Sequence, residues 1–279
     1  IYSSEIPISA GEIQTNENGD FEITFKAIAP LKQNEVNYYN YSVIAEVTDA
    51  TGETHTQNTH VKIGSHSLLI SADLPPIMDS QNAKDVLIKA QTPNGKTLQK
   101  EIVFKLEKLK TPDHIIKEQP WDVDTNFTTI PIESSEISDL SIEATVLIKT
   151  LNTKNDSIIP KSIFQALSNG AYKMTLTATE KNGLKVEQTA FVKILSSQNN
   201  EMPLKAASFF FMDKTIAQVD EQIKFSLGTS YKKQDYYYLM TSGNKIIESG
   251  WQKINDEIKH INIKILEEYR GGISLQVFF

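Results

Sequence analysis

The chain has 279 residues, a net charge of −7 at pH 7 and no cysteine. Its length allows two or three domains, each with its own core. The acidic balance argues against nucleic-acid binding, which needs a basic surface to replace phosphate counterions. The lack of cysteine excludes disulfides, zinc–thiolate sites and cysteine nucleophiles, and no apolar run reaches the roughly 20 residues that span a bilayer.

The first predicted elements are a turn, a strand and a hairpin. Residues 15–20, TNENGD, are typical of a turn, and FEITFKA at 21–27 alternates apolar and polar residues as a half-buried strand does. Residues 41–64, YSVIAEVTDATGETHTQNTHVKIG, predict a β-hairpin whose turn begins at Asp49 and ends at Gly52.

The middle of the chain continues the series of strands. Alternation and β-branched residues predict three of them, at 85–91, 102–106 and 141–151. IPKSIFQALSNG at 159–170 gives the best helix signal, because Pro160 suits the first helical position, and we expect one to three turns. The longest region without strand signals, 111–136, is expected to be an exposed loop.

A second hairpin repeats the first one. YKMTLTATEKNGLKVEQTAFVKIL at 172–195 aligns with 41–64 without a gap, and the two share a Tyr at the start, a Gly in the turn and Val-Lys-Ile near the end. An isolated hairpin has nothing against which to bury its apolar face. We therefore expect each copy to close a larger sandwich with its own core.

The last third adds strand signals at 208–212, 235–240, 244–251, 260–265 and 273–279. Strands every dozen or so residues with at most one short helix predict an all-β fold of tandem antiparallel β-sandwiches, immunoglobulin- or fibronectin-like. The repeat then predicts three modules. Residues 1–65 form the C-terminal part of one, 66–197 a complete one, and 198–279 a third, complete or truncated.

The order of these segments resembles the macroglobulin-like domains of bacterial alpha-macroglobulins of Bacteroidetes type. The stretches that carry the resemblance are TNENGDFEITFKA, YSVIAEVTDATGETHTQNTHVKIG, LLISADLP and NIKILEEYRGGISLQVFF. The resemblance implies seven-stranded sandwiches that enclose proteases, with a thioester in a Cys-Gly-Glu-Gln motif. That motif is absent, because Glu118-Gln119 and Glu221-Gln222 lack the Cys-Gly before them, and no functional residue carries over.

The same resemblance sets the expected partners and location. Proteases, or other domains of the same parent chain, would be the partners, in the periplasm or at the surface of a bacterium. The chain begins with Ile1 rather than Met and shows no signal peptide, so we expect an internal part of a longer protein. A lipid anchor outside these residues would be its only link to a membrane.

No residue pattern predicts catalysis, a metal site or a cofactor, so we expect a protein that is not an enzyme. His55 and His60 lie five apart on a strand and so point to opposite faces. A calcium loop at 16–20 would need an acidic ligand where Phe25 stands, so these residues are expected to form a plain turn. Asp122-Val123-Asp124 stays open as a weak calcium candidate. P-loop, Gly-x-Gly-x-x-Gly and Gly-x-Ser-x-Gly motifs are missing from the sequence.

Aromatic residues are the candidates for an interaction surface: Trp121, Tyr236, Tyr237 and Tyr238. On a strand, Tyr237 faces away from its two neighbours, into solvent or against another module. Phe209–Phe211 is expected in a core and at a contact between modules. Exposed tyrosines keep a second hypothesis open, a glycan-binding or adhesive string of modules. A third hypothesis is a set of support domains for a larger enzyme.

Overall fold

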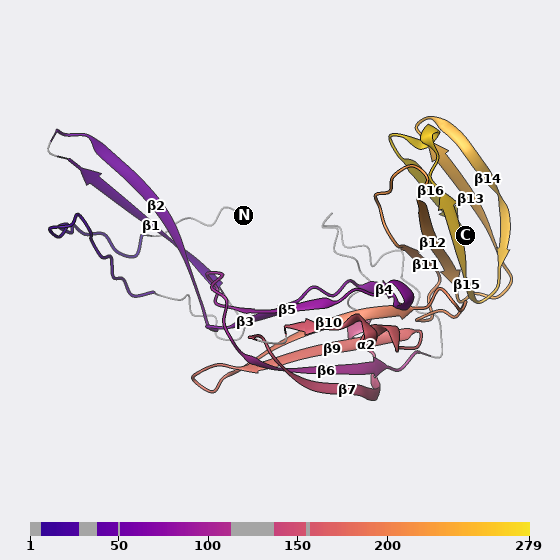
Figure 1. Ribbon diagram of the computed structural model, residues 1–279, viewed down its shortest axis with the longest axis horizontal. Helices are drawn as coiled ribbons and strands as arrows, with labels where there is room; N and C mark the ends of the chain where they lie inside the picture. The colour runs from indigo at the N-terminus through magenta and orange to yellow at the C-terminus, as the bar shows by residue number, and fades with distance from the viewer. Residues whose placement is uncertain (1–6, 28–37, 50, 113–136, 155–156) are drawn as a thin grey trace. The chain divides into compact units, whose positions relative to one another are not determined.

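The computed structural model describes residues 7–27, 38–49, 51–112, 137–154 and 157–279. These residues form an all-β structure of tandem antiparallel sandwiches with little helix (Figure 1). Two compact units divide the chain. The first comprises residues 1–69 and 91–98, and the second comprises 70–90 and 99–279. Both of the predicted modules at 66–197 and 198–279 therefore fall mainly in the second unit.

The first unit contains the first predicted hairpin, formed by β1 (Tyr38–Thr48) and β2 (Thr54–Gly64). Gly52 takes a φ of +86°, which an L side chain rarely adopts, and its N–H donates to the carbonyl of Asp49. The predicted strand at 21–27 is not formed, because these residues have no ladder partner in the described chain. Instead, the ring of Phe25 lies 5.6 Å from that of Tyr41.

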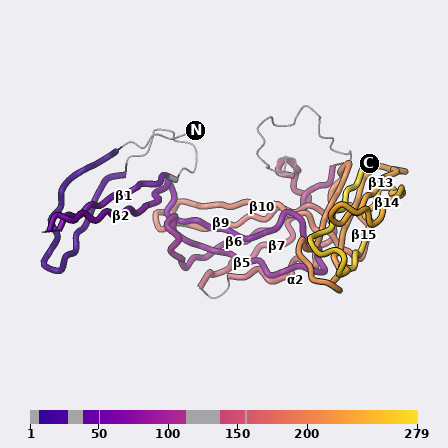
Figure 2. The backbone as a smooth tube through the Cα atoms, turned by 90° about the horizontal axis from the view of Figure 1, so that it is seen from above, coloured from indigo at the N-terminus to yellow at the C-terminus, as the bar shows by residue number. Residues whose placement is uncertain are grey.

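The middle sandwich belongs to the second unit and has two sheets. One has the order β3 (Leu69–Ala72), β5 (Val86–Gln91) and β8 (Ile158–Ile159). The other has the order β4 (Ile77–Asp79), β10 (Lys185–Leu195), β9 (Gly170–Thr179), β6 (Glu101–Leu109) and β7 (Ile142–Asn152). Figure 2 shows β6, β9 and β10 running side by side. The core between the sheets includes Ile88, Phe104 and Met174, none more than 2% exposed.

The repeated sequence gives the same hairpin twice. In β9–β10, Thr179 pairs with Lys185, and in β1–β2 the aligned Thr48 pairs with Thr54. The turns also agree, since Gly183 has a φ of +84° and its N–H donates to the carbonyl of Glu180. The two hairpins lie in different compact units.

The predicted helix is present but short. It is α2 (Lys161–Gln165), which begins directly after Pro160, and its Phe164 is fully buried. A 3-10 turn, η1 (Ser80–Asn82), follows β4.

The C-terminal sandwich has two three-stranded sheets. The first has the order β11 (Phe209–Met212), β12 (Gln222–Thr229) and β15 (Glu257–Lys264), and the second has the order β14 (Lys245–Ile254), β13 (Gln234–Ser242) and β16 (Ile273–Phe278). A 3-10 turn, η2 (Glu267–Tyr269), precedes β16. Phe225, Leu227, Tyr236 and Ile254 form the core between the sheets.

Candidate functional site

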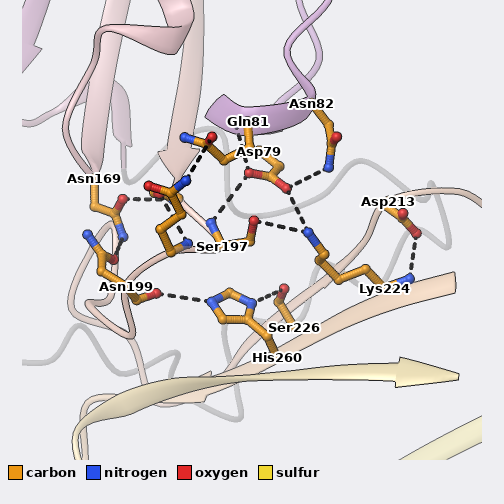
Figure 3. Close-up of polar contacts among 12 residues, drawn as sticks. Asp79, Gln81, Asn82, Asn169, Ser197, Asn199, Asp213, Lys224, Ser226 and His260 are labelled. Carbon is orange, nitrogen blue, oxygen red and sulfur yellow. Dashed lines mark hydrogen bonds and ion pairs between the residues drawn. The ribbon is translucent and has the colours of Figure 1, made fainter. Parts of the chain in front are cut away.

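Polar side chains from the two sandwiches of the second unit meet around the linker that joins β10 to β11 (Figure 3). We call this group the joint and define it by five residues: Asp79, Ser197, Asn199, Lys224 and His260. They come from the end of β4, the linker, β12 and β15. The joint combines a buried carboxylate (Asp79), an ammonium group (Lys224) and an imidazole (His260).

Asp79 is the buried anion of the joint, with 3% of its surface exposed. It caps η1, because its carboxylate accepts hydrogen bonds from the backbone N–H of Gln81 at 3.1 Å and the side-chain amide of Asn82 at 2.9 Å. The backbone N–H of Ser197 lies 3.4 Å from the same carboxylate. A buried carboxylate needs such donors, since burial without them would be costly.

Lys224 supplies the opposite charge from the other sandwich. Its ammonium group lies 3.5 Å from Oδ2 of Asp79 and donates to the hydroxyl of Ser197 at 3.0 Å. Its side chain is 23% exposed, so water screens this ion pair less than it screens a pair on the surface. Because Lys224 lies within β12 and Asp79 at the end of β4, the ion pair connects the two sandwiches directly.

His260 connects β15 to the linker through both ring nitrogens. Nε2 lies 3.0 Å from the carbonyl oxygen of Asn199, and Nδ1 lies 2.9 Å from the hydroxyl of Ser226. A carbonyl only accepts hydrogen bonds, so Nε2 carries the proton and donates it. In the neutral ring Nδ1 then accepts from Ser226. Both nitrogens are thus used for structural contacts.

Asn169 fixes the linker to the middle sandwich. It lies just before β9, and its side-chain oxygen accepts the N–H of Ser196 at 2.7 Å. Its amide nitrogen donates to the side chain of Asn199 and to the carbonyl of Glu201, each at 2.7 Å. The linker is therefore held at three successive points.

Apolar contacts complete the joint. Leu195 at the end of β10 packs with Phe209 and Ile258 of the C-terminal sandwich, and all three are buried. Gly228 in β12 allows close approach: a Cβ there would lie 2.6 Å from the sulfur of Met202. The linker is therefore bordered by apolar contacts as well as by hydrogen bonds.

The polar contacts described at the joint are hydrogen bonds and an ion pair between parts of this chain. No group of three or more His, Asp or Glu side chains that could hold a metal ion occurs in the part of the chain that the structure describes. The predicted turn at 16–20 has its own explanation, because the side-chain oxygen of Asn16 accepts the N–H groups of Asn18 and Asp20. Glu221, of the Glu221-Gln222 pair, binds the ammonium group of Lys214 at 2.9 Å.

The structure separates the three consecutive tyrosines. Tyr236 lies in the core and is 3% exposed, and burial raises its pKa. Tyr238 packs partly buried against the same core, and its hydroxyl donates to Glu248 at 2.5 Å, which raises its pKa. Tyr237 points to the opposite face, where its ring lies 5.4 Å from that of Trp251.

This outer face carries a row of aromatic side chains that the sequence analysis did not assemble. Tyr237 pairs across the sheet with Trp251 on one side and with Phe278 on the other. Trp251 is 72% exposed and Phe278 is 53% exposed. The sequence predicted that Tyr237 faces away from Tyr236 and Tyr238. Its position beside Trp251 and Phe278 could not be predicted, because it depends on the register of β13 with β14 and β16.

Several predictions fall outside the described residues. Trp121, Glu118-Gln119 and Asp122–Asp124 all lie in 113–136, as does most of the predicted loop at 111–136. None of the described helices has the length and the hydrophobicity that crossing a bilayer requires.

Comparison with family models and with curated proteins finds no match. Among solved structures, the chain is similar to Salmonella alpha-2-macroglobulin reacted with methylamine, at 12% identity and a TM-score of 0.29, over 88% of this chain and 16% of that one. It is also similar to Escherichia coli alpha-2-macroglobulin in its native conformation, at 14% identity and a TM-score of 0.28, over 85% of this chain and 18% of that one. A third similar structure is a tetra-tandem repeat from the extending region of a large adhesion protein, at 11% identity and a TM-score of 0.25, over 82% of this chain and 49% of that one. The chain thus spans less than a fifth of the two macroglobulins, and these comparisons assign it to no family.

Proposed function

We propose that this chain is a non-catalytic scaffold in an exported bacterial protein, in which tandem sandwiches are held in fixed order by packed joints. The observation that carries the proposal is the joint itself. Domain interfaces within a chain are usually polar and allow movement. Here a buried ion pair, a doubly bonded imidazole and an apolar cluster hold the linker, an arrangement suited to passing a displacement of one sandwich to the next.

Within that class we propose a macroglobulin-type protein of the cell envelope that traps proteases. The support is the order of the segments around the repeated hairpin, together with a joint that would let the middle and C-terminal sandwiches move as one rigid body when a protease cuts elsewhere. The proposed partners are proteases and neighbouring domains of the same polypeptide. The proposed location is the periplasm or cell surface, with a lipid anchor outside these residues.

The test uses the complete protein that carries this chain. Proteases of different specificity are added, and size-exclusion chromatography with light scattering follows the size of the protein and the retention of the protease. Trapping predicts a change in hydrodynamic radius after cleavage and co-elution of the protease. An unchanged radius with no retained protease would contradict trapping, but it would not contradict the proposal of a non-catalytic scaffold.

A second candidate function is adhesion through glycans, which the row of Trp251, Tyr237 and Phe278 favours. Aromatic rings bind the apolar faces of sugars, and neighbouring strands place successive side chains about 5 Å apart. A glycan array probed with the chain and with Trp251→Ala tests it. Binding that Trp251→Ala abolishes and Trp251→Phe retains would support adhesion, and an array without binding would remove its support.

A further inference from the structure

The six described strands of the C-terminal sandwich repeat the order of six of the eight strands of the middle sandwich, and β10 and β4 have no counterpart among them. Its sheets β11-β12-β15 and β14-β13-β16 correspond to β3-β5-β8 and to β7-β6-β9 in both chain order and sheet order. In the middle sandwich the second sheet continues from β9 to β10 and β4. β16 is therefore the counterpart of β9, but in the described chain it pairs only with β13.

The side chains of β16 differ from those of β9 in the way an unpaired edge predicts. Tyr172, Met174 and Leu176 of β9 are at most 1% exposed. By contrast, Leu275 and Val277 of β16 pack against the core but stay partly buried. Every residue of β16 is at least partly exposed.

A groove of about 880 Å³ opens between β11 and β16. Apolar side chains line much of it: Phe210, Met212, Ile216, Ile223, Leu266 and Leu275. Phe210 is 48% exposed and Ile216 is 86% exposed. In the middle sandwich β10 fills the place beside β9, with its Val192 and Ile194 fully buried.

We propose that the free edge of β16 is an acceptor for one antiparallel strand of the character of β10, joined to β16 through a tight turn. The arrangement that covers β9 identifies this occupant, because β16 is the counterpart of β9 and β10 is the strand that pairs with the free side of β9. Aliphatic side chains at alternate positions of the added strand would enter the groove, since alternate residues share a face. Its backbone would satisfy the unpaired donors and acceptors of the edge. This proposal holds whether the protein binds proteases or glycans.

The test extends the chain after Phe279 with the sequence of residues 181–195, KNGLKVEQTAFVKIL. This length places the appended copy of Val186 opposite Val277, as Val186 itself lies opposite Ala178 in the β9–β10 register. Hydrogen exchange read by mass spectrometry is expected to slow at β16 by about 100-fold, because the outward amides gain partners. The melting temperature of the C-terminal sandwich is expected to rise by about 5 °C or more.

The matched control carries the same extension with asparagine at the positions of Val186, Ala190, Val192 and Ile194. If the edge of β16 accepts such a strand, the first extension should slow hydrogen exchange at β16 and the control extension should not. Equal protection by both extensions, or protection by neither, would overturn it. Exchange at β16 in the unextended chain that slows as protein concentration rises would assign the edge to a second copy and also overturn it.

Discussion

The ammonium nitrogen of Lys224 lies 3.5 Å from Oδ2 of Asp79, although one side chain belongs to the C-terminal sandwich and the other to the middle sandwich. Asp79 is almost fully buried, so its side-chain oxygens find their hydrogen-bond partners among a few groups of the protein. Lys224 brings the positive charge and also binds Ser197 of the linker. This ion pair therefore couples the stability of the joint to the packing of both sandwiches.

Removal of the cation at the joint is expected to destabilise the protein. Lys224→Met keeps most of the apolar stem but leaves the carboxylate of Asp79 without its opposite charge. Because backbone and amide donors still reach Asp79, we expect a loss of about 1–3 kcal/mol in the free energy of unfolding. Urea unfolding followed by circular dichroism measures it.

A surface ion pair of the same sandwich serves as the control for Lys224→Met. The ammonium group of Lys264 lies 2.9 Å from Asp220, but the two side chains are 56% and 78% exposed. Lys264→Met should cost about 0–1 kcal/mol. Equal losses for the two variants would contradict the special role of the buried pair.

Close packing at Gly228 gives a second prediction. A Cβ at this position would lie 2.9 Å from Ile258 and 3.2 Å from the carbonyl oxygen of Glu257, besides its contact with the sulfur of Met202. Gly228→Ala is expected to lower the free energy of unfolding by about 1–3 kcal/mol through overpacking. Adding Met202→Ala removes one of the clashing atoms, so the double variant should lose less than the sum of the single losses; strict additivity would argue against the contact.

The repeated turn predicts equal costs at two aligned glycines. Gly52 and Gly183 have φ values of +86° and +84°, and a Cβ at either would meet no atom within 4 Å. Alanine at each position, and valine at Gly183 more strongly, should therefore destabilise through backbone strain of about 1 kcal/mol or more rather than through lost packing. Thermal unfolding of the variants measures this. Gly11→Ala, where space is open and φ is ordinary, should change nothing, and unchanged melting of the turn variants would refute the prediction.

The turn of the first hairpin predicts a pH dependence. The hydroxyl of Thr51, then the backbone N–H of Glu53, stabilise the charged carboxylate of Asp49 and lower its pKa below the ordinary 3.8. A carboxyl whose pKa is lower in the folded state stabilises the fold above its unfolded pKa, and this contribution is lost as pH falls through the folded pKa. NMR titration of the carboxyl carbon should give a midpoint below the ordinary value. In Thr51→Val the midpoint should rise, and a midpoint that stays unchanged would contradict the assignment.

Much of the fold was predictable because strand periodicity is local. The two hairpins, their turns and most strands of the middle and C-terminal sandwiches follow from alternation and turn residues. Strands β4, β8 and β12 were not predicted. The first two have only three and two residues, too few to show a period. β12 is buried almost throughout, because Phe225 and Leu227 lie in the core and Ser226 on the other face contacts His260, so buried polar residues break the alternation.

The joint could not be predicted, because its residues meet only after two sandwiches have folded. Asp79 and Lys224 are 145 positions apart in the sequence, and nothing in their local patterns marks either as buried or paired. His260 likewise resembles any histidine on a strand. The strand at 21–27 failed for a related reason, since alternation alone does not supply a neighbouring strand.

If the joint holds the middle and C-terminal sandwiches as one body, the distance between them is fixed. The chain has no cysteine, so Val103→Cys and Ile246→Cys, both at exposed positions, allow one spin label in each sandwich. Electron–electron resonance then measures the distance distribution, with Leu87→Cys and Val103→Cys as the reference pair within one sandwich. The account predicts a distribution across the joint as narrow as the reference, and a broader one after Lys224→Met. A broad distribution in the otherwise unaltered chain, unaffected by Lys224→Met, would contradict it.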